Sequence, residues 1–241
     1  MCIRNDGEHH RLLCDLALPV DAIYGVTRQI RRMFDLDADP HAVADHLSAD
    51  PAFAPLVRRY PGQRVPGAFS GFEVAVRAIV GQQISVVGAT TVTARLVAGQ
   101  GRAVGGVDGL DRAFPEPARL AEVAVGKLPM PRRREETIRA LARGVASGDL
   151  DLGADAALAR LRADLLATPG IGPWTAEYIA MRVLNDPDAF LASDLVVRKA
   201  ARRVLNVDGD KALVQRMESA RPWRAYANML LWRSEAEYAW E

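Results

Sequence analysis

The stretch that decides the fold runs from Leu166 to Tyr178 and reads Leu-Ala-Thr-Pro-Gly-Ile-Gly-Pro-Trp-Thr-Ala-Glu-Tyr. A helical pattern lies on each side of its Pro-Gly-Ile-Gly centre, and glycine supplies the backbone freedom that a tight reversal needs. Pro173 stands where a helix accepts proline, in its first turn. The sequence therefore predicts a helix–hairpin–helix over residues 166–178.

Such a hairpin has the properties of a phosphate-binding turn. The first N–H groups of its second helix lack partners within the helix and carry a partial positive charge. Small residues allow these amides to approach a phosphate closely. A helical hairpin that binds nothing is the alternative, and two glycines alone do not decide between the two.

The composition indicates a helical globular protein. Of the 241 residues, 49% are hydrophobic, 25% are charged and only 6% are aromatic, which favours helix over sheet. A net charge of +1 excludes a strongly basic surface over the whole molecule, so any nucleic-acid surface must be local. No apolar run reaches the roughly 18 residues of a membrane span, and the first residues lack the apolar core that is typical of a signal peptide. We expect a cytoplasmic protein without membrane contact.

The chain divides into a short first unit and a long helical one. Residues 11–18 predict one strand and residues 22–34 an amphipathic helix. We expect residues 1–38 to be a truncated remnant of an α/β domain, with the chain beginning inside it, and residues 39–241 to form a helical domain. Helices are expected at residues 40–47, 52–60, 71–95, 117–124, 132–146, 158–166, 196–205 and 223–232.

A carboxylate and two aromatic rings are the first candidates for chemistry. Asp194, or Ser193 before it, can be the N-cap of the helix that follows. Trp174 and Tyr178 are four residues apart and therefore share a helix face. Capping and core packing explain these residues without any function. A fixed anion beside an aromatic wall can instead hold an electron-poor or cationic ligand.

Residues 169–178 followed by Phe190-Leu-Ala-Ser-Asp194 resemble the helix–hairpin–helix, Gly/Pro-rich loop and aspartate of the HhH-GPD DNA glycosylase superfamily. Residues 65–86, 130–134 and 221–232 resemble its alkylated-base branch, 3-methyladenine DNA glycosylase II. The resemblance extends from about residue 12 to the C-terminus, with the motifs in the family's order. It implies a mainly α fold of two helical subdomains with a cleft between them, preceded by the short α/β remnant.

The resemblance implies a role for each residue that matches a functional position of the family. Asp194 resembles the catalytic aspartate, and Trp174, Tyr178 and Trp232 resemble the aromatic walls around a flipped base. The residue at the DNA-wedging position is Gln83, a polar side chain where the family has leucine. The hairpin residues that resemble the phosphate grip are Gly170, Ile171 and Gly172, and the backbone of Thr168 and Gly170 is expected to bind a monovalent cation such as Na⁺ or K⁺.

Trp174 also indicates which reaction to expect. Glycosylases that nick the DNA backbone carry a lysine nucleophile at this position, and tryptophan cannot form a Schiff base. Lys127, Lys199 and Lys211 lie in other predicted elements. The resemblance therefore implies a monofunctional enzyme without lyase activity at abasic sites. No cysteine follows Cys14, so we expect no iron–sulfur cluster. We also expect no other cofactor.

The energetics of a single carboxylate fit a labile substrate. Breaking the glycosidic bond builds an oxocarbenium-like cation on the sugar. One carboxylate about 4 Å away, at an effective dielectric near 20, contributes roughly 4 kcal/mol, which is on the order of a thousandfold in rate. This gain in rate falls well short of what a stable base requires, but a base already made cationic by alkylation leaves more readily. The expected function is therefore release of alkylated purines of the 3-methyladenine type from DNA during base excision repair.

Two other functions stay open. A non-catalytic protein that binds DNA structure could use the same hairpin, and a related glycosylase could act on oxidised or deaminated bases. For the expected glycosylase, the partner is double-stranded DNA with alkylated bases, and we expect a monomer associated with the nucleoid. Leu195 follows the aspartate where the family often has an aromatic residue, so we expect a roomier pocket. The cations expected to contact phosphates are Arg132, Arg133, Arg134, Arg198, Lys199, Arg202 and Arg203.

Overall fold

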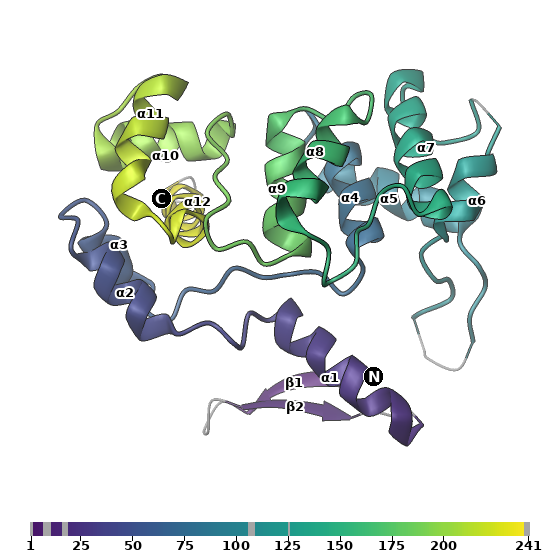
Figure 1. Cartoon of the computed structure of the whole chain (residues 1–241), viewed down its shortest axis with the longest axis horizontal. Coiled ribbons are helices and arrows are strands. Elements are labelled where there is room, and N and C mark those ends of the chain that lie inside the picture. Colours follow the sequence, from purple (N-terminus) through teal and green to yellow (C-terminus); the bar gives the residue numbers. More distant parts are fainter. Residues whose placement is uncertain (1, 7–10, 16–18, 106–108, 125, 239–241) are drawn as a thin grey trace.

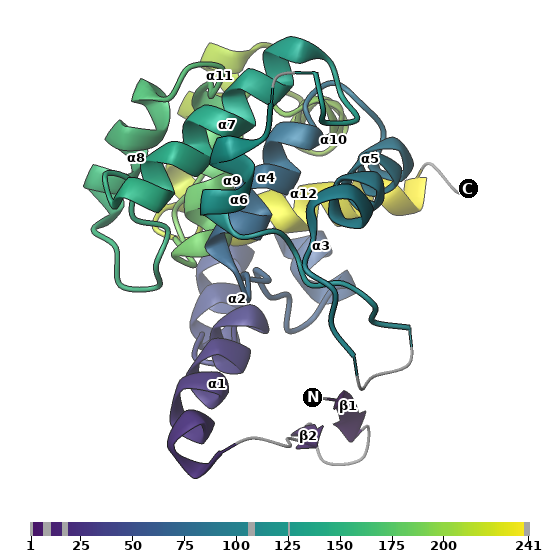
Figure 2. The ribbon, with the colours of Figure 1, turned by 90° about the vertical axis from the view of Figure 1, so that its right-hand side faces the viewer.

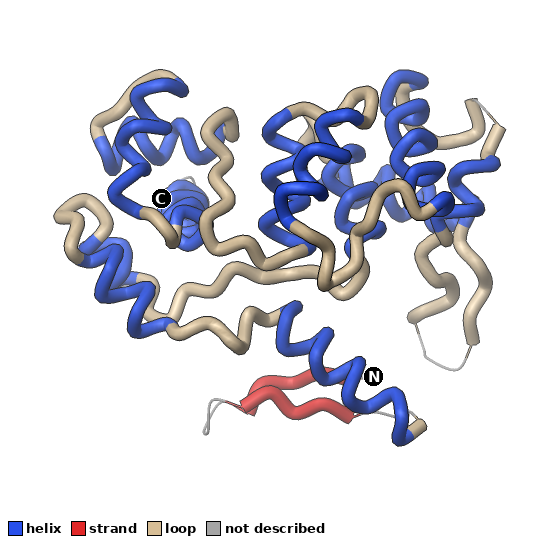
Figure 3. Tube along the Cα trace, in the orientation of Figure 1, coloured by secondary structure: helices blue, strands red, loops and turns tan. Residues whose placement is uncertain are grey.

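The computed structural model describes residues 2–6, 11–15, 19–105, 109–124 and 126–238. Regular structure in this part of the chain is almost entirely helical, which confirms the expected mainly α class (Figures 1 and 3). None of its helices is both long and apolar enough to cross a membrane. The helices are α1 (Val20–Met33), α2 (Pro40–Ser48), α3 (Ala54–Arg59), α4 (Gly71–Val80), α5 (Val86–Gln100), α6 (Pro117–Glu122), α7 (Arg132–Ser147), α8 (Leu158–Ala167), α9 (Pro173–Val183), α10 (Leu195–Leu205), α11 (Asp210–Arg216), the 3-10 helix η1 (Met217–Ala220) and α12 (Arg224–Tyr238).

Two hydrophobic cores divide these helices into two subdomains. One core joins α2 and α3 to α10, α11 and α12, with Phe53 and Leu231 fully buried in it. The other joins α4 to α9, with Ile138 and Leu165 fully buried. The two groups lie side by side in Figure 1, and Figure 2 shows the same arrangement from the end. The expected pair of helical subdomains is therefore confirmed, whereas an open cleft between them stays a prediction.

The N-terminal unit differs from its expectation in the number of strands. β1 (Cys2–Asp6) and β2 (Arg11–Asp15) form an antiparallel pair in which Cys2 lies opposite Asp15. Only one strand was predicted because Cys-Ile-Arg-Asn-Asp has no apolar alternation, whereas pairing uses backbone groups that every residue carries. The predicted strand positions 16–18 lie outside the described residues.

Hydrogen bonds from the side chain of Arg32 to backbone carbonyl groups attach helix α1 to the helical domain. The guanidinium of Arg32 donates to Ala154 O at 2.6 Å and to Val183 O at 2.5 Å. Farther along, the carboxylate of Asp35 accepts from Val65 N at 3.0 Å and from the Tyr226 hydroxyl at 2.8 Å. These contacts join the first unit to both subdomains, and the domain boundary at residue 38 stays a prediction.

The region expected to be helical from 71 to 95 is two helices with a loop between them. α4 ends at Val80 and α5 begins at Val86. Gln83 has a positive φ of 57°, which interrupts a helix, and the Ser85 side chain caps α5 by accepting from Gly88 N at 3.1 Å. The break places Gln83 at an exposed turn.

Candidate active site

Asp194 lies at the beginning of α10 and accepts four hydrogen bonds. Its Oδ1 accepts from Val196 N and Val197 N, each at 2.9 Å, as an N-cap does. The same oxygen accepts from Trp232 Nε1 at 2.9 Å, and Oδ2 accepts from Trp174 Nε1 at 3.0 Å. The capping role and the predicted functional role therefore belong to one side chain.

The two carboxylate oxygens of Asp194 have different surroundings. Oδ1 is occupied by three N–H donors, whereas Oδ2 has a single donor, Trp174 Nε1. Asp194 is half-buried, so part of the residue is accessible to solvent. Because a carboxylate oxygen can accept more than one hydrogen bond, Oδ2 can accept a further one.

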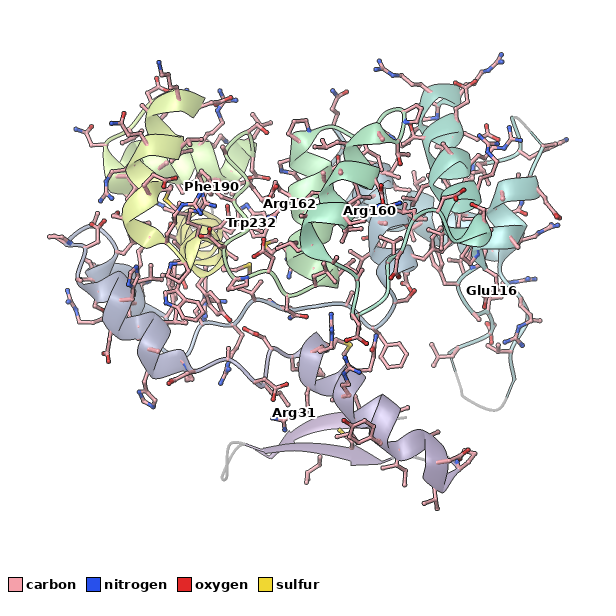
Figure 4. All side chains as sticks on the ribbon, in the orientation of Figure 1. Arg31, Glu116, Arg160, Arg162, Phe190 and Trp232 are labelled. Carbon is pink, nitrogen blue, oxygen red and sulfur yellow. The ribbon has the colours of Figure 1, made fainter. Side chains whose placement is uncertain are left out.

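Trp174 and Trp232 reach Asp194 from different subdomains. Trp174 is in the first turn of α9, and Trp232 projects from α12, where Figure 4 labels it in the left-hand subdomain. Tyr178 packs against both hydrophobic cores, and its ring lies 6.5 Å from that of Trp232. The structure thus brings the four predicted residues of catalysis and base pocket together at the junction of the two subdomains.

Three side chains stack on one another along α9. The rings of Trp174 and Tyr178 stack with centroids 5.4 Å apart and an angle of 17°. The guanidinium carbon of Arg182 lies over the Tyr178 ring at 5.3 Å from its centroid. Residues four apart are offset by about 6 Å along a helix, so Tyr178 lies between the other two. The two faces of the Tyr178 ring are therefore occupied by Trp174 and Arg182.

The hairpin between α8 and α9 forms where it was expected. Gly170 has a φ of +88°, and a Cβ on it would lie 1.9 Å from the Thr137 hydroxyl on α7. Both the backbone conformation and the close approach of α7 therefore require glycine here. Of the three residues expected to grip a phosphate, Ile171 differs, because its amide already donates to Thr168 O at 3.1 Å. The amides of Gly170 and Gly172 make no hydrogen bond to a described residue.

The carbonyls proposed for a monovalent cation are already hydrogen-bonded within the protein. Thr168 O accepts from Ile171 N, and Gly170 O accepts from Gln82 Nε2 at 3.2 Å. A carbonyl oxygen has two lone pairs, so each retains one that can coordinate a cation. No cluster of three histidine, cysteine or acidic side chains able to hold a metal occurs among the described residues.

The loop that carries Gln83 is tied to the hairpin through its neighbour. Gln82 Nε2 donates to Gly170 O and to the Thr175 hydroxyl at 3.0 Å. Arg134 on α7 in turn donates to Gln82 O at 2.5 Å. The predicted wedge at Gln83 and the predicted phosphate grip at Gly170 are therefore held in a fixed relation.

Most of the cations expected to contact phosphates have partners within the protein. Arg132 pairs with Glu136, Arg198 with Asp210, and Arg202 with Asp208. Arg203 donates to Ser234 O and pairs with Glu235. Within the described chain, no hydrogen bond or ion pair engages the side chain of Arg133 or Lys199, and both are exposed. These two cations are the ones best suited to bind a phosphate.

Sequence reasoning missed Arg182 and Gln82 as parts of this site, and it expected Arg134 to contact phosphate, whereas the structure shows Arg134 donating to Gln82 O. Arg182 is four residues after Tyr178, as Tyr178 is after Trp174, so the spacing alone could have placed all three on one helix face. The bonds of Gln82 to Gly170 and of Arg134 to Gln82 gave no local signal, because they join residues 88 and 52 positions apart.

Comparison with known proteins identifies the family. The family described as "HhH-GPD superfamily base excision DNA repair protein" matches residues 76–225, and the "AlkA N-terminal domain" matches residues 1–70. The structure is similar to the 3-methyladenine DNA-glycosylase from Archaeoglobus fulgidus, with a TM-score of 0.83, 24% identity and coverage of 96% of this chain and 81% of that one. That likeness concerns the fold.

Two curated relatives share more sequence. The "Probable bifunctional transcriptional activator/DNA repair enzyme AlkA" of Mycobacterium tuberculosis is 46% identical over 86% of this chain, which spans only 42% of that protein. The "DNA-3-methyladenine glycosylase 2" of Escherichia coli is 33% identical over 86% of this chain and 71% of that protein. On this similarity the chain belongs to the HhH-GPD superfamily of base excision DNA repair proteins, in the branch of 3-methyladenine DNA glycosylase II.

Proposed function

We propose that this chain is a monofunctional DNA glycosylase of base excision repair. It flips an alkylated purine of the 3-methyladenine type out of double-stranded DNA and hydrolyses its N-glycosidic bond, leaving an abasic site. The observation that supports this most directly is the carboxylate of Asp194, held by the indole N–H groups of Trp174 and Trp232 where the two subdomains meet. A protein that only bound DNA would have no use for an anion between two aromatic walls.

Each of these residues has a role in the reaction. A base flipped out of the stack would lie against the outer faces of Trp174 and Trp232. When the C1′–N bond breaks, its electron pair moves onto the base and positive charge develops on the sugar. Asp194 Oδ2 stabilises that charge and orients a water molecule, whose oxygen bonds to C1′ as its proton is released.

The same site supports hydrolysis without cutting the DNA backbone. Trp174 occupies the position at which lyase-type relatives carry their nucleophilic lysine, and an indole N–H that donates to Asp194 cannot attack C1′. The reaction needs no cofactor. A monovalent cation bound by the hairpin carbonyls of Thr168 and Gly170 would strengthen the phosphate contact alone.

Double-stranded DNA is the proposed partner, bound by a monomer on the nucleoid. The unengaged amides of Gly170 and Gly172 and the exposed cations Arg133 and Lys199 would bind phosphates, and Gln83 would fill the gap left by the flipped base. Phosphate contacts position the protein without reading sequence, as a search for damage requires.

The test compares the wild type with Asp194→Asn on methylated duplex DNA. We expect the wild type to release free methylated purine without strand nicks before alkali, and the variant to be slower by on the order of a thousandfold. Asp208→Asn, an exposed carboxylate at the opposite end of α10, is the matched control and should keep full activity. Release by Asp194→Asn at the wild-type rate would refute the assignment, and nicking or borohydride-trapped covalent complexes would refute monofunctional chemistry.

A further inference from the structure

Arg182 is fixed against two walls of the candidate base pocket. Its guanidinium carbon lies 5.3 Å from the ring centroid of Tyr178 on its own helix and 5.9 Å from that of Trp232 on α12. Its Nη1 donates to Pro66 O at 2.7 Å, which holds the side chain in place from the loop before α4. Arg182 therefore contacts both subdomains and the aromatic rings at their junction.

Among the described residues, no carboxylate neutralises the charge of Arg182. No acidic side chain of this part of the chain lies within ion-pair distance of it, whereas Arg198, Arg202 and Arg203 on α10 each pair with one. Its Nε is buried without any hydrogen-bond partner. A half-buried guanidinium in such surroundings acts electrostatically over a longer range than an exposed, paired one.

We propose that Arg182 sets the preference of this site between cationic and neutral damaged purines. This inference rests on the proposed glycosylase function and specifies how that site selects its substrate. Arg182 faces the rings of Tyr178 and Trp232, and a flipped base stacked on Trp232 lies within the range of its charge.

The electrostatics follow from the charge that each base carries. An N7-methylated purine enters the pocket with a positive charge, which the guanidinium repels, and becomes neutral when it receives the electron pair of the broken bond. A neutral deaminated purine enters uncharged and gains negative charge in the same step, which the guanidinium attracts. At every stage the two bases differ by one unit of charge, so Arg182 favours the neutral base.

The experiment measures kcat/KM for 7-methylguanine and for hypoxanthine in the same duplex context. Arg182→Lys keeps the charge, whereas Arg182→Met and Arg182→Gln remove it, and Arg182→Gln also keeps a donor for Pro66 O. We expect the ratio of kcat/KM for 7-methylguanine to that for hypoxanthine to rise roughly tenfold in both neutral variants. In Arg182→Lys we expect the ratio to stay within about twofold of the wild type.

A residue that merely supports the fold would lower both activities in proportion. An unchanged ratio in Arg182→Gln and Arg182→Met, with wild-type release of both bases, would overturn the role of Arg182 and leave the proposed function intact. A wild type that released neither base would contradict the proposed function and this inference with it. A rise in the ratio in all three variants would show that shape rather than charge controls it, and would also overturn the proposal.

Discussion

Asp194 combines a structural role with the proposed chemical role in one side chain. As the N-cap of α10 it has two backbone donors on Oδ1, so its position does not depend on a ligand. The indoles of Trp174 and Trp232 add one donor to each oxygen and set the rotation of the carboxylate plane. Hydrogen bonds to a charged group are stronger than neutral ones, so this orientation is well determined.

The unequal donors of the two oxygens predict unequal effects of two conservative substitutions. Trp174→Phe keeps an aromatic ring but removes the single donor to Oδ2, whereas Trp232→Phe leaves Oδ1 with two amide donors. We expect the single-turnover rate of base release to fall by about tenfold or more in Trp174→Phe, from a loss of about 1.5–3 kcal/mol, and by less in Trp232→Phe. Affinity for abasic DNA serves as the control and should change little. A larger loss in Trp232→Phe would contradict this geometry.

At the scale of elements, an ion-pair cluster joins the two helices of the helix–hairpin–helix. Arg162 on α8 makes two hydrogen bonds of 2.8 Å to Glu177 on α9 and one of 2.5 Å to Asp186 beyond α9. Figure 4 labels Arg162 between the two subdomains. Asp186 is 6% exposed, and the carboxylates hold the pKa of Arg162 above its usual range. The cluster fixes the angle at which α9 presents Trp174.

Removing Arg162 should therefore destabilise the hairpin. We expect Arg162→Met to lower the free energy of unfolding by about 2–3 kcal/mol, because Glu177 and the buried Asp186 lose their shared cation. Urea unfolding measures the change. Arg160→Met, one half-turn away on α8, breaks a surface pair with Asp164 and should cost no more than about 1 kcal/mol. Equal losses in the two variants would refute the role given to the cluster.

At the scale of the whole molecule, two carboxylates join distant parts of the chain with opposite electrostatic consequences. Burial raises the pKa of Asp35, which receives hydrogen bonds from Val65 N and from the Tyr226 hydroxyl. The guanidinium of Arg216 lowers the pKa of Asp50 through hydrogen bonds of 2.6 and 2.7 Å. Each carboxylate links an N-terminal segment to the C-terminal helices.

The two sites should therefore give opposite pH profiles of stability. As the pH rises above the ordinary carboxyl pKa of 3.8, the folded protein holds the Asp35 proton longer than the unfolded chain, so Asp35 contributes less to stability. The contribution of Asp50 is present above 3.8 and is lost as the pH falls through its lowered folded pKa. With rising pH, the free energy of unfolding of the wild type minus that of Asp35→Asn should fall, and the same difference for Asp50→Asn should rise. Urea unfolding from pH 3 to pH 7 measures both, and parallel profiles would contradict the assignments.

The local sequence determined the helical class, the hairpin and the cap at Asp194. Each of these depends on residues within one or two turns of each other, such as Gly170 at a positive φ or a carboxylate directly before α10. The local sequence did not predict β1, because that strand lacks apolar alternation. It also did not predict the helix break at Gln83, which lies inside an apolar helical stretch. Backbone pairing and a single left-handed residue leave little trace in a hydrophobic pattern.

Only the tertiary structure decided how the site is assembled. The sequence indicated Trp232 by its resemblance, but its bond to Asp194 joins residues 38 positions apart and depends on how α12 packs against α10. The position of Arg182 beside Trp232 depends on the packing of one subdomain against the other. Local propensity specifies each helix and its exposed faces, whereas the distances between side chains on different helices are set by the close packing of the two cores.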